Sequence, residues 1–192
     1  MPSNKFWHMA SIEPKRQFRW VATIGTGTGK VNSYVVKKVG RPEWTTAEKE
    51  HKMLGHTFYY PGPVTWNTVD VTIVDIADRS PTTSTAVGVG DDAIKYLNKL
   101  VVGCGYVPPD KTTAAATNTL GITKAKSVKT LGGLLIKQLN ASGKALEEYK
   151  FYNPFVQKIT YGPEFDYESD AILDVTLTIR YDWAEIDTIS GV

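Results

Sequence analysis

Alternation of apolar and polar side chains is the dominant pattern along this chain. In residues 171–183 every odd position is apolar, and every even position after Ile172 is polar. A period of two is typical of a strand with one buried and one solvated face. Similar patterns predict further strands at residues 17–24, 31–39, 56–60, 64–74, 127–139, 145–152 and 155–161.

Turn-forming residues separate these runs. A glycine-rich segment, residues 25–30, lies between two of them, and Asn140, Ser142 and Gly143 lie between two others. Such residues supply the positive φ angles and local hydrogen bonds of tight turns. Consecutive antiparallel hairpins are therefore expected, and the fold class is mainly β.

One helix is expected, at residues 91–102. Asp91 or Asp92 can cap its amino end, Gly103 can close it, and its apolar residues form one stripe. Two stretches, residues 78–89 and 104–125, show no period and are expected to be long loops. Because the strand pattern resumes after each loop, we expect one domain spanning residues 1–192.

Composition limits the class of protein. The 192 residues are 42% hydrophobic and 11% aromatic, and Gly and Pro number only 16 and 10, which excludes collagen-like and disordered chains. No apolar run approaches the ~20 residues of a membrane-spanning helix. Residues 1–10 lack the pattern of a secretory signal, and the single cysteine, Cys104, suits a reducing compartment, so we expect synthesis in a cytosol without a membrane anchor.

Charge is unevenly distributed, although the net charge is only +2. Residues 1–60 carry 10 Lys and Arg against 4 Asp and Glu, whereas residues 151–192 carry 2 against 8. Oppositely charged faces would favour head-to-tail stacking of identical copies. Alternatively, the chain segments mix in space and the asymmetry disappears.

Candidate sites for small ligands are weak. The segment Gly25–Lys30 resembles a phosphate-binding loop, but Ile24 stands where the first glycine is needed and Val31 where Ser or Thr is needed. His51 and His56 lack acidic or thiol partners at zinc-site spacing. Residues 164–170 alternate carboxylates without the spacing of an EF-hand.

Nucleophilic catalysis has little support. No Gly-x-Ser-x-Gly motif occurs, and Cys104 has no histidine nearby in the sequence. We therefore expect no catalytic residues, no cofactor and no metal ion.

The final third of the chain carries a recognisable order of features. An aromatic strand ending in Asn153-Pro154 is followed by a second strand, an acidic-aromatic turn at residues 166–170, and a last strand ending in Tyr181-Asp182. This order resembles the carboxy-terminal region of tail tube proteins of contractile-tailed bacteriophages. Residues 18–22 and 64–75 resemble the opening and central strands of the same family.

The resemblance implies a fold of two packed antiparallel sheets, as a sandwich or barrel, with one flanking helix. It implies six copies in a ring, with rings stacked into a tube inside a contractile sheath in the virion tail, assembled in the host cytoplasm. The implied partners are further copies of the chain, the sheath protein, and the baseplate tube-initiator and tail terminator proteins. Double-stranded DNA would pass through the lumen without specific binding.

Two sets of surface residues are expected to serve such a tube. A conduit for DNA should not grip phosphate, so a lumen of mixed or acidic charge is expected, with Tyr149 and Phe151 facing the core. The lumen-facing candidates are Lys38, Lys129, Lys137, Glu148 and Lys150. The ring-stacking candidates are Lys49, Lys52, Glu164, Asp166, Glu168 and Asp170.

Other functions remain open from the sequence. A tube-initiator protein, or the tube protein of a secretion or bacteriocin machine, would share the fold and differ in its partners. A different class of protein, a monomeric β-sandwich binding module or small enzyme, would use the loop at residues 104–125 as its site.

Overall fold

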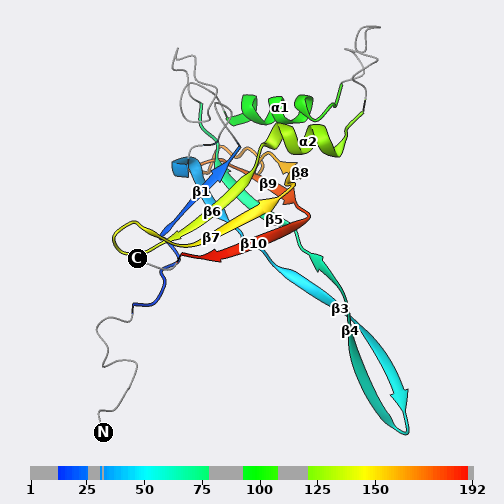
Figure 1. The fold of residues 1–192 in the computed structure, drawn as a ribbon. Helices are drawn as coiled ribbons and strands as arrows, with labels where there is room; N and C mark the ends of the chain where they lie inside the picture. The colour runs from blue at the N-terminus through cyan, green and yellow to red at the C-terminus, as the bar shows by residue number, and fades with distance from the viewer. Residues whose placement is uncertain (1–12, 26–30, 32, 78–92, 108–120, 190–192) are drawn as a thin grey trace, which may run out of the picture.

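The computed structural model describes residues 13–25, 31, 33–77, 93–107 and 121–189. Its strands form two four-stranded antiparallel sheets and one separate hairpin (Figure 1). Sheet A has the order β1 (Trp20–Ile24), β6 (Leu134–Leu139), β7 (Ala145–Tyr152) and β10 (Trp183–Thr188). Sheet B has the order β2 (Val36–Val39), β5 (Val69–Val74), β9 (Asp174–Arg180) and β8 (Phe155–Thr160). The hairpin is β3 (Trp44–Met53) and β4 (His56–Trp66).

The alternating residues of the two sheets build one hydrophobic core. Sheet A contributes Ile136 and Phe151, and sheet B contributes Val71 and Leu177, each buried. In β9 the apolar residues Val175, Leu177 and Ile179 are 0% exposed while the polar residues between them are half-buried. Alternation thus predicts both the strands and the face that each strand buries.

Two helices cover one end of the sheets (Figure 1). The first, α1 (Ala93–Gly103), confirms the expected helix and buries Tyr96, Leu97 and Leu100. The second, α2 (Lys124–Leu131), begins after Thr123, whose side chain accepts a hydrogen bond from the Lys126 amide. None of the helices in the described part of the chain is long and apolar enough to cross a membrane.

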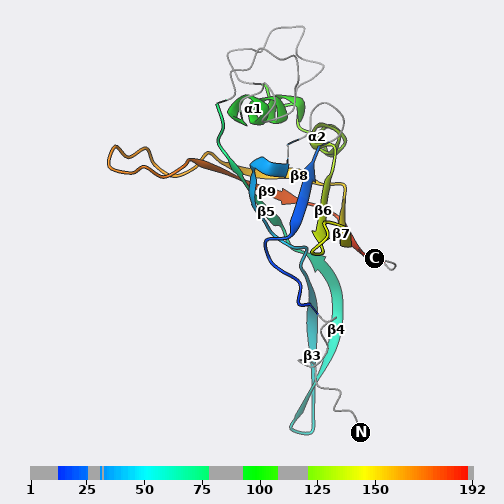
Figure 2. The ribbon, with the colours of Figure 1, turned by 90° about the vertical axis from the view of Figure 1, so that its left-hand side faces the viewer.

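The β3–β4 hairpin projects away from the two sheets (Figure 1). In the view turned by 90°, the loop between β8 and β9, residues 161–173, projects in another direction (Figure 2). Side chains along both hairpin strands are almost all exposed. The hairpin therefore contributes little to the core of a single subunit.

Several elements differ from the sequence-based expectation. The prediction of one strand over residues 127–139 was wrong for its first part. Helix α2, which begins after Thr123 and ends at Gly132 with φ 82°, occupies that part, and only residues 134–139 form a strand, β6. The strand expected at residues 31–39 is a short 3₁₀ turn, Ser33–Val35, followed by β2. The single run at 171–183 holds β9 and the start of β10. Residues 78–89 and most of 104–125 lie outside the described residues.

Candidate assembly surfaces

The outer half of the β3–β4 hairpin has two chemically different faces. Cross-strand pairing places Lys49 opposite Tyr60, His51 opposite Phe58, and Met53 opposite His56. Directly paired residues share a face, and successive residues alternate between faces. One face, which we call the aromatic face, therefore carries Lys49, His51, Met53, His56, Phe58 and Tyr60. The opposite face carries Glu48, Glu50, Lys52, Thr57, Tyr59 and Pro61.

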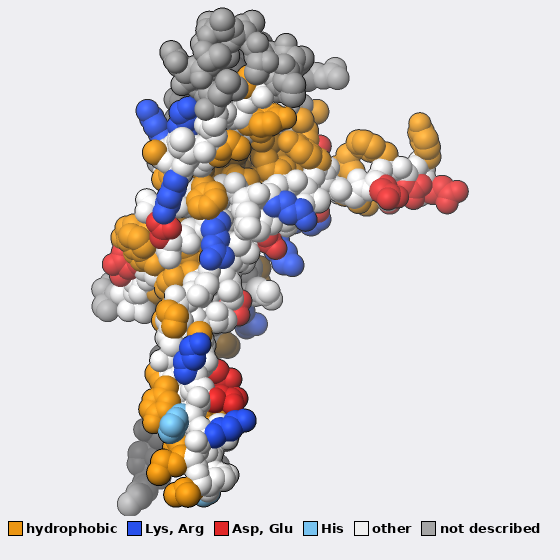
Figure 3. All heavy atoms as spheres, turned by 90° about the vertical axis from the view of Figure 1, so that its right-hand side faces the viewer, with side chains coloured by type: hydrophobic (Ala, Val, Ile, Leu, Met, Phe, Trp, Pro, Cys, Tyr) orange, Lys and Arg blue, Asp and Glu red, His pale blue; other side chains and the backbone are white. Residues whose placement is uncertain are grey.

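The aromatic face has no cover within the subunit. Met53, Phe58 and Tyr60 are 55%, 48% and 57% exposed. Figure 3 shows hydrophobic side chains along one side of the hairpin and charged side chains along the other. An exposed amphipathic ribbon of this kind is typical of a surface that another molecule covers.

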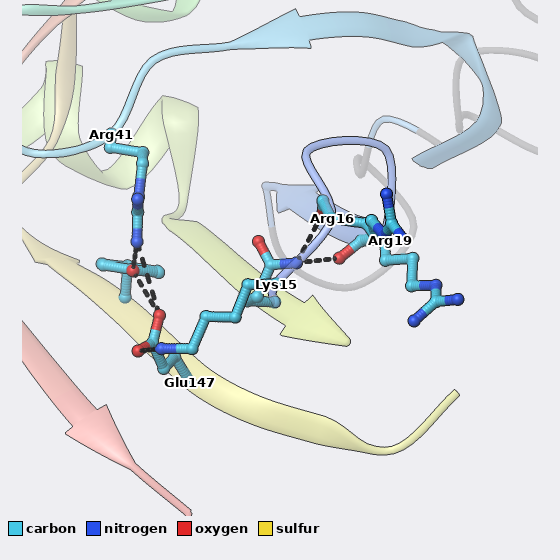
Figure 4. Close-up of polar contacts among 7 residues, drawn as sticks. Lys15, Arg16, Arg19, Arg41 and Glu147 are labelled. Carbon is cyan, nitrogen blue, oxygen red and sulfur yellow. Dashed lines mark hydrogen bonds and ion pairs between the residues drawn. The ribbon is translucent and has the colours of Figure 1, made fainter. Parts of the chain in front are cut away.

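A polar cluster holds the base of the hairpin (Figure 4). Arg41, three residues before β3, contacts the hydroxyl of Tyr149 and lies 3.4 Å from a Glu147 carboxylate oxygen. The Tyr149 hydroxyl donates to Glu147 at 2.7 Å, and Lys15 binds the other oxygen of the same carboxylate. The cluster thus joins the amino-terminal segment, the approach to the hairpin and strand β7.

Hydrogen bonds in this cluster change the acid strength of Glu147. The Lys15 ammonium, and then the Tyr149 hydroxyl, lower the pKa of the Glu147 carboxyl. Because the folded state holds the ionised form, this interaction stabilises the fold above the ordinary carboxyl pKa. The stabilisation is lost as the pH falls below that value.

The outer face of sheet A carries a ladder of charges. Lys137 pairs with Glu148 at 3.0 Å, and Lys150 pairs with Asp187 at 3.0 Å and with Glu148 at 3.7 Å. The hydrogen bond to Asp187 raises the pKa of Lys150. With Glu185 beside Lys150 in the register, the face holds both signs of charge.

The structure brings together three of the five lumen-facing candidates. Lys137, Glu148 and Lys150 share the outer face of sheet A, while Tyr149 and Phe151 point into the core as expected. Lys38 lies on β2 of sheet B, and Lys129 lies on the last turn of α2. Which surface lines a lumen stays a prediction.

The ring-stacking candidates lie on two separate projections. Lys49 and Lys52 lie near the hairpin tip, on opposite faces. Glu164, Asp166, Glu168 and Asp170 lie in the 161–173 loop, with all four side chains exposed. Glu48 and Glu50 accompany the two lysines, so the hairpin carries both signs of charge.

The sites considered for small ligands gather no ligand set. His51 and His56 lie on the aromatic face, and within the described ranges no group of three or more His, Cys, Asp or Glu could hold a metal ion. Ile24 and Val31, on either side of the glycine-rich segment, form an isolated antiparallel bridge. Residues 26–30 themselves lie outside the described residues.

Sequence reasoning predicted part of the hairpin and missed β3 and the edge strand β10. The strand expected at residues 56–60 lies within β4, and the single strand expected at residues 64–74 is the end of β4 followed by β5. Residues 44–53 are mostly polar and bury no face, so the alternation of a half-buried strand is absent. The available sequence signal was Gly55, because glycine favours the positive φ that a two-residue hairpin turn requires. In the structure Leu54 and Gly55 both have positive φ, 50° and 80°.

Comparison with known proteins identifies the fold. No protein-family model and no curated protein sequence matches the chain. A chain of the anti-feeding prophage tube-terminating cap matches with TM-score 0.61 and 15% identity, covering 94% of this chain and 95% of that chain. A chain of the anti-feeding prophage baseplate matches with TM-score 0.56 and 12% identity, covering 94% and 99%.

A third match comes from the sheath–tube complex of an extracellular contractile injection system in its extended state. The TM-score is 0.54 and the identity 15%, covering 97% of this chain and 100% of that chain. All three identities are low, so the likeness is one of fold over nearly the whole length. The chain therefore has the mainly β, two-sheet fold found in the cap, baseplate and sheath–tube structures of contractile injection systems.

Proposed function

We propose that this chain is a structural tube subunit of a contractile tail or injection machine, and that its activity is self-assembly. The observation that carries the proposal is the likeness to contractile injection system chains, which spans 94–97% of this chain in the three matches described. No enzymatic step is part of this function.

Open sheet edges support ring formation. Strands β1 and β10 are the edges of sheet A, and β2 and β8 are the edges of sheet B. Edge strands present unpaired backbone groups that invite another strand. When copies join edge to edge around a ring, the joined sheets close into a barrel and the free edges disappear.

The aromatic face of the hairpin supports contact between copies. Phe58, Tyr60 and Met53 are exposed to solvent in the single subunit. Their burial against another copy would stabilise the contact, since burial of apolar area is worth about 25 cal/mol per Å². The hairpin projects far from the two sheets (Figure 2), so it can contact a neighbouring copy in the same ring or in the next ring.

The charge ladder on sheet A suits the wall of a DNA conduit. Lys137 and Lys150 are already paired with carboxylates, so few free cations would face the phosphates. Affinity for DNA rises steeply with each neutralised phosphate, and a paired wall therefore permits passage. We place this face on the lumen of a six-membered ring, inside a sheath in a virion tail assembled in the host cytoplasm.

The partners of this function are further copies of the chain, a sheath protein, and the proteins that begin and end the tube. Double-stranded DNA would cross the lumen during ejection without being bound. A secretion or bacteriocin machine would use the same ring with another cargo.

Light scattering and negative-stain electron microscopy across a concentration series test the proposal. We expect hollow rings or tubes above a threshold concentration. A variant with Phe58→Ala and Tyr60→Ala serves as the control that keeps the fold and loses the contact. A wild-type protein that stays monomeric at every concentration would contradict the proposal and favour a binding module.

An end cap is a second candidate. The TM-score of 0.61 to a tube-terminating cap favours it. A cap would form single rings that do not elongate, whereas a tube subunit would form filaments with a repeating spacing. The same electron micrographs therefore separate the two.

A further inference from the structure

A groove of about 910 Å³, lined by both apolar and polar side chains, lies beside the edge strand β8. Its walls come from α1, α2, β8 and the ends of β4 and β9. The apolar lining includes Leu100, Val101, Ile122, Phe155, Val156 and Ile159. Figure 3, which faces this side, shows hydrophobic side chains gathered above sheet B and the 161–173 loop extending to the side.

Three cations line the same groove. Lys124 is held by Asp182, with 2.6 Å between ammonium and carboxylate. Lys158 and Arg180 line it as well, and neither forms an ion pair with any residue that the structure describes. An apolar floor with unpaired cations fits a ligand that combines apolar rings with carboxylates.

The 161–173 loop has this composition. Phe165 is 91% exposed, and Tyr167 is fully exposed. Glu164, Asp166, Glu168 and Asp170 alternate with them, and within the described ranges none of the four forms an ion pair. The loop leaves the body at the end of β8 and projects away from it (Figure 2). Phe165 and Tyr167 are not among the residues that line the groove of their own subunit.

We propose that the acidic-aromatic 161–173 loop of one copy docks in the β8 groove of a second copy. Phe165 and Tyr167 enter the apolar floor, and the loop carboxylates pair with Lys158 and Arg180. Tyr161, at the base of the loop, lines the groove, but the docking part of the loop and the groove are different surfaces. The contact is therefore head-to-tail, and repeated contacts make rings or filaments rather than closed dimers. The inference rests on the proposed function and names one contact that the assembly uses.

Disulfide trapping in the full-length protein tests this contact. Cys104 already lines the groove and is the only cysteine of the chain. Ser169→Cys places a second thiol in the loop while keeping Phe165 and Tyr167. The matched control is Ser142→Cys, in the exposed turn between β6 and β7.

After mild oxidation, we expect Ser169→Cys to give a ladder of covalent multimers on a non-reducing gel. Ser142→Cys should give none, and adding Cys104→Ser to Ser169→Cys should abolish the ladder. A ladder that survives the loss of Cys104 would mean that loops meet loops, and no ladder would mean that another segment fills the groove. Either result overturns the proposal.

Charge reversal gives a second readout. Lys158→Glu with Arg180→Glu should raise the concentration needed for assembly at least tenfold, and adding Glu164→Lys with Asp166→Lys should restore it. Lys144→Glu, in the distant turn, is the control. Assembly unchanged by the groove reversal, or not restored by the loop reversal, would contradict the contact.

The two proposals fail differently. Tubes seen by microscopy without a Cys104-dependent ladder would overturn the docking contact and leave the tube function standing. A Cys104-dependent ladder without rings or tubes would overturn the tube function and leave the contact standing.

Discussion

Strand β5 and strand β4 of the hairpin both carry large apolar or aromatic side chains on one face, with opposite results. In β5, Val69, Val71 and Ile73 are at most 2% exposed, because sheet A and α1 supply the other half of the core. On the hairpin, Phe58 and Tyr60 also share one face, yet they are about half exposed. An apolar face on a strand therefore does not tell which chain covers it. For β5 the cover comes from the same subunit, and for the hairpin we propose that it comes from another copy.

The largest expected effect comes from a substitution in the buried face that β5 and β9 share. Leu177→Ala removes a side chain that is 0% exposed, and the free energy of unfolding should fall by about 2–5 kcal/mol. Urea unfolding of the dilute protein measures it. A fall below about 0.5 kcal/mol would show that the β9 face is not the centre of the core.

Removing the aromatic face should affect assembly rather than folding. Phe58→Ala with Tyr60→Ala should raise the assembly threshold at least tenfold, because buried aromatic anchors at interfaces are each worth about 2 kcal/mol. The free energy of unfolding should change by less than about 0.5 kcal/mol.

Tyr59→Ala, on the opposite face, is the matched control, and light scattering gives the threshold. Equal effects of the two faces on assembly would remove the distinction between them.

The base of the hairpin provides a pH-dependent effect of intermediate size. Glu147→Gln should lower the free energy of unfolding at pH 7 by about 1.5 kcal/mol, the scale of hydrogen bonds to a charged group. Because the pKa of Glu147 is lowered in the folded state, the wild type should lose this advantage as the pH falls below the ordinary value of 4.5.

Chemical denaturation between pH 3 and pH 7 would therefore show wild type and variant converging at the acidic end. Curves that stay parallel over this range would mean that Lys15 and Tyr149 do not favour the ionised carboxylate.

The smallest expected effect concerns the hairpin tip. Leu54 has φ 50° and is 88% exposed. Asparagine tolerates this backbone conformation better, so Leu54→Asn should leave the thermal midpoint within about 2 °C of the wild type. A larger fall would show that the Leu54 side chain contributes to the folded subunit.

Sequence patterns predicted the parts of the fold whose partners lie within the chain. Apolar residues recur with the strand period in β5, β7, β8 and β9 and with the helical period in α1, because these elements pack on one core. The burial of Tyr149 and Phe151 followed from the alternation in β7. Helix α2 was missed because its eight residues bury only Ser127 and Leu131, which leaves almost no helical stripe to detect.

The candidate site was less predictable than the core. Lys137, Glu148 and Lys150 form one ladder because register places them side by side, and register was not readable from the sequence. The acidic loop was recognised from its composition, but the groove that complements it combines α1, α2, β8 and the ends of β4 and β9. Such a surface exists only once the chain has folded.

Hydrogen exchange on dilute and assembled protein tests most directly whether the hairpin contacts another copy. Amides of residues 44–66 should exchange several-fold more slowly after assembly, while those of β9, already buried in the single subunit, should not change. Unchanged exchange of the hairpin in particles that electron microscopy shows to be assembled would contradict the account.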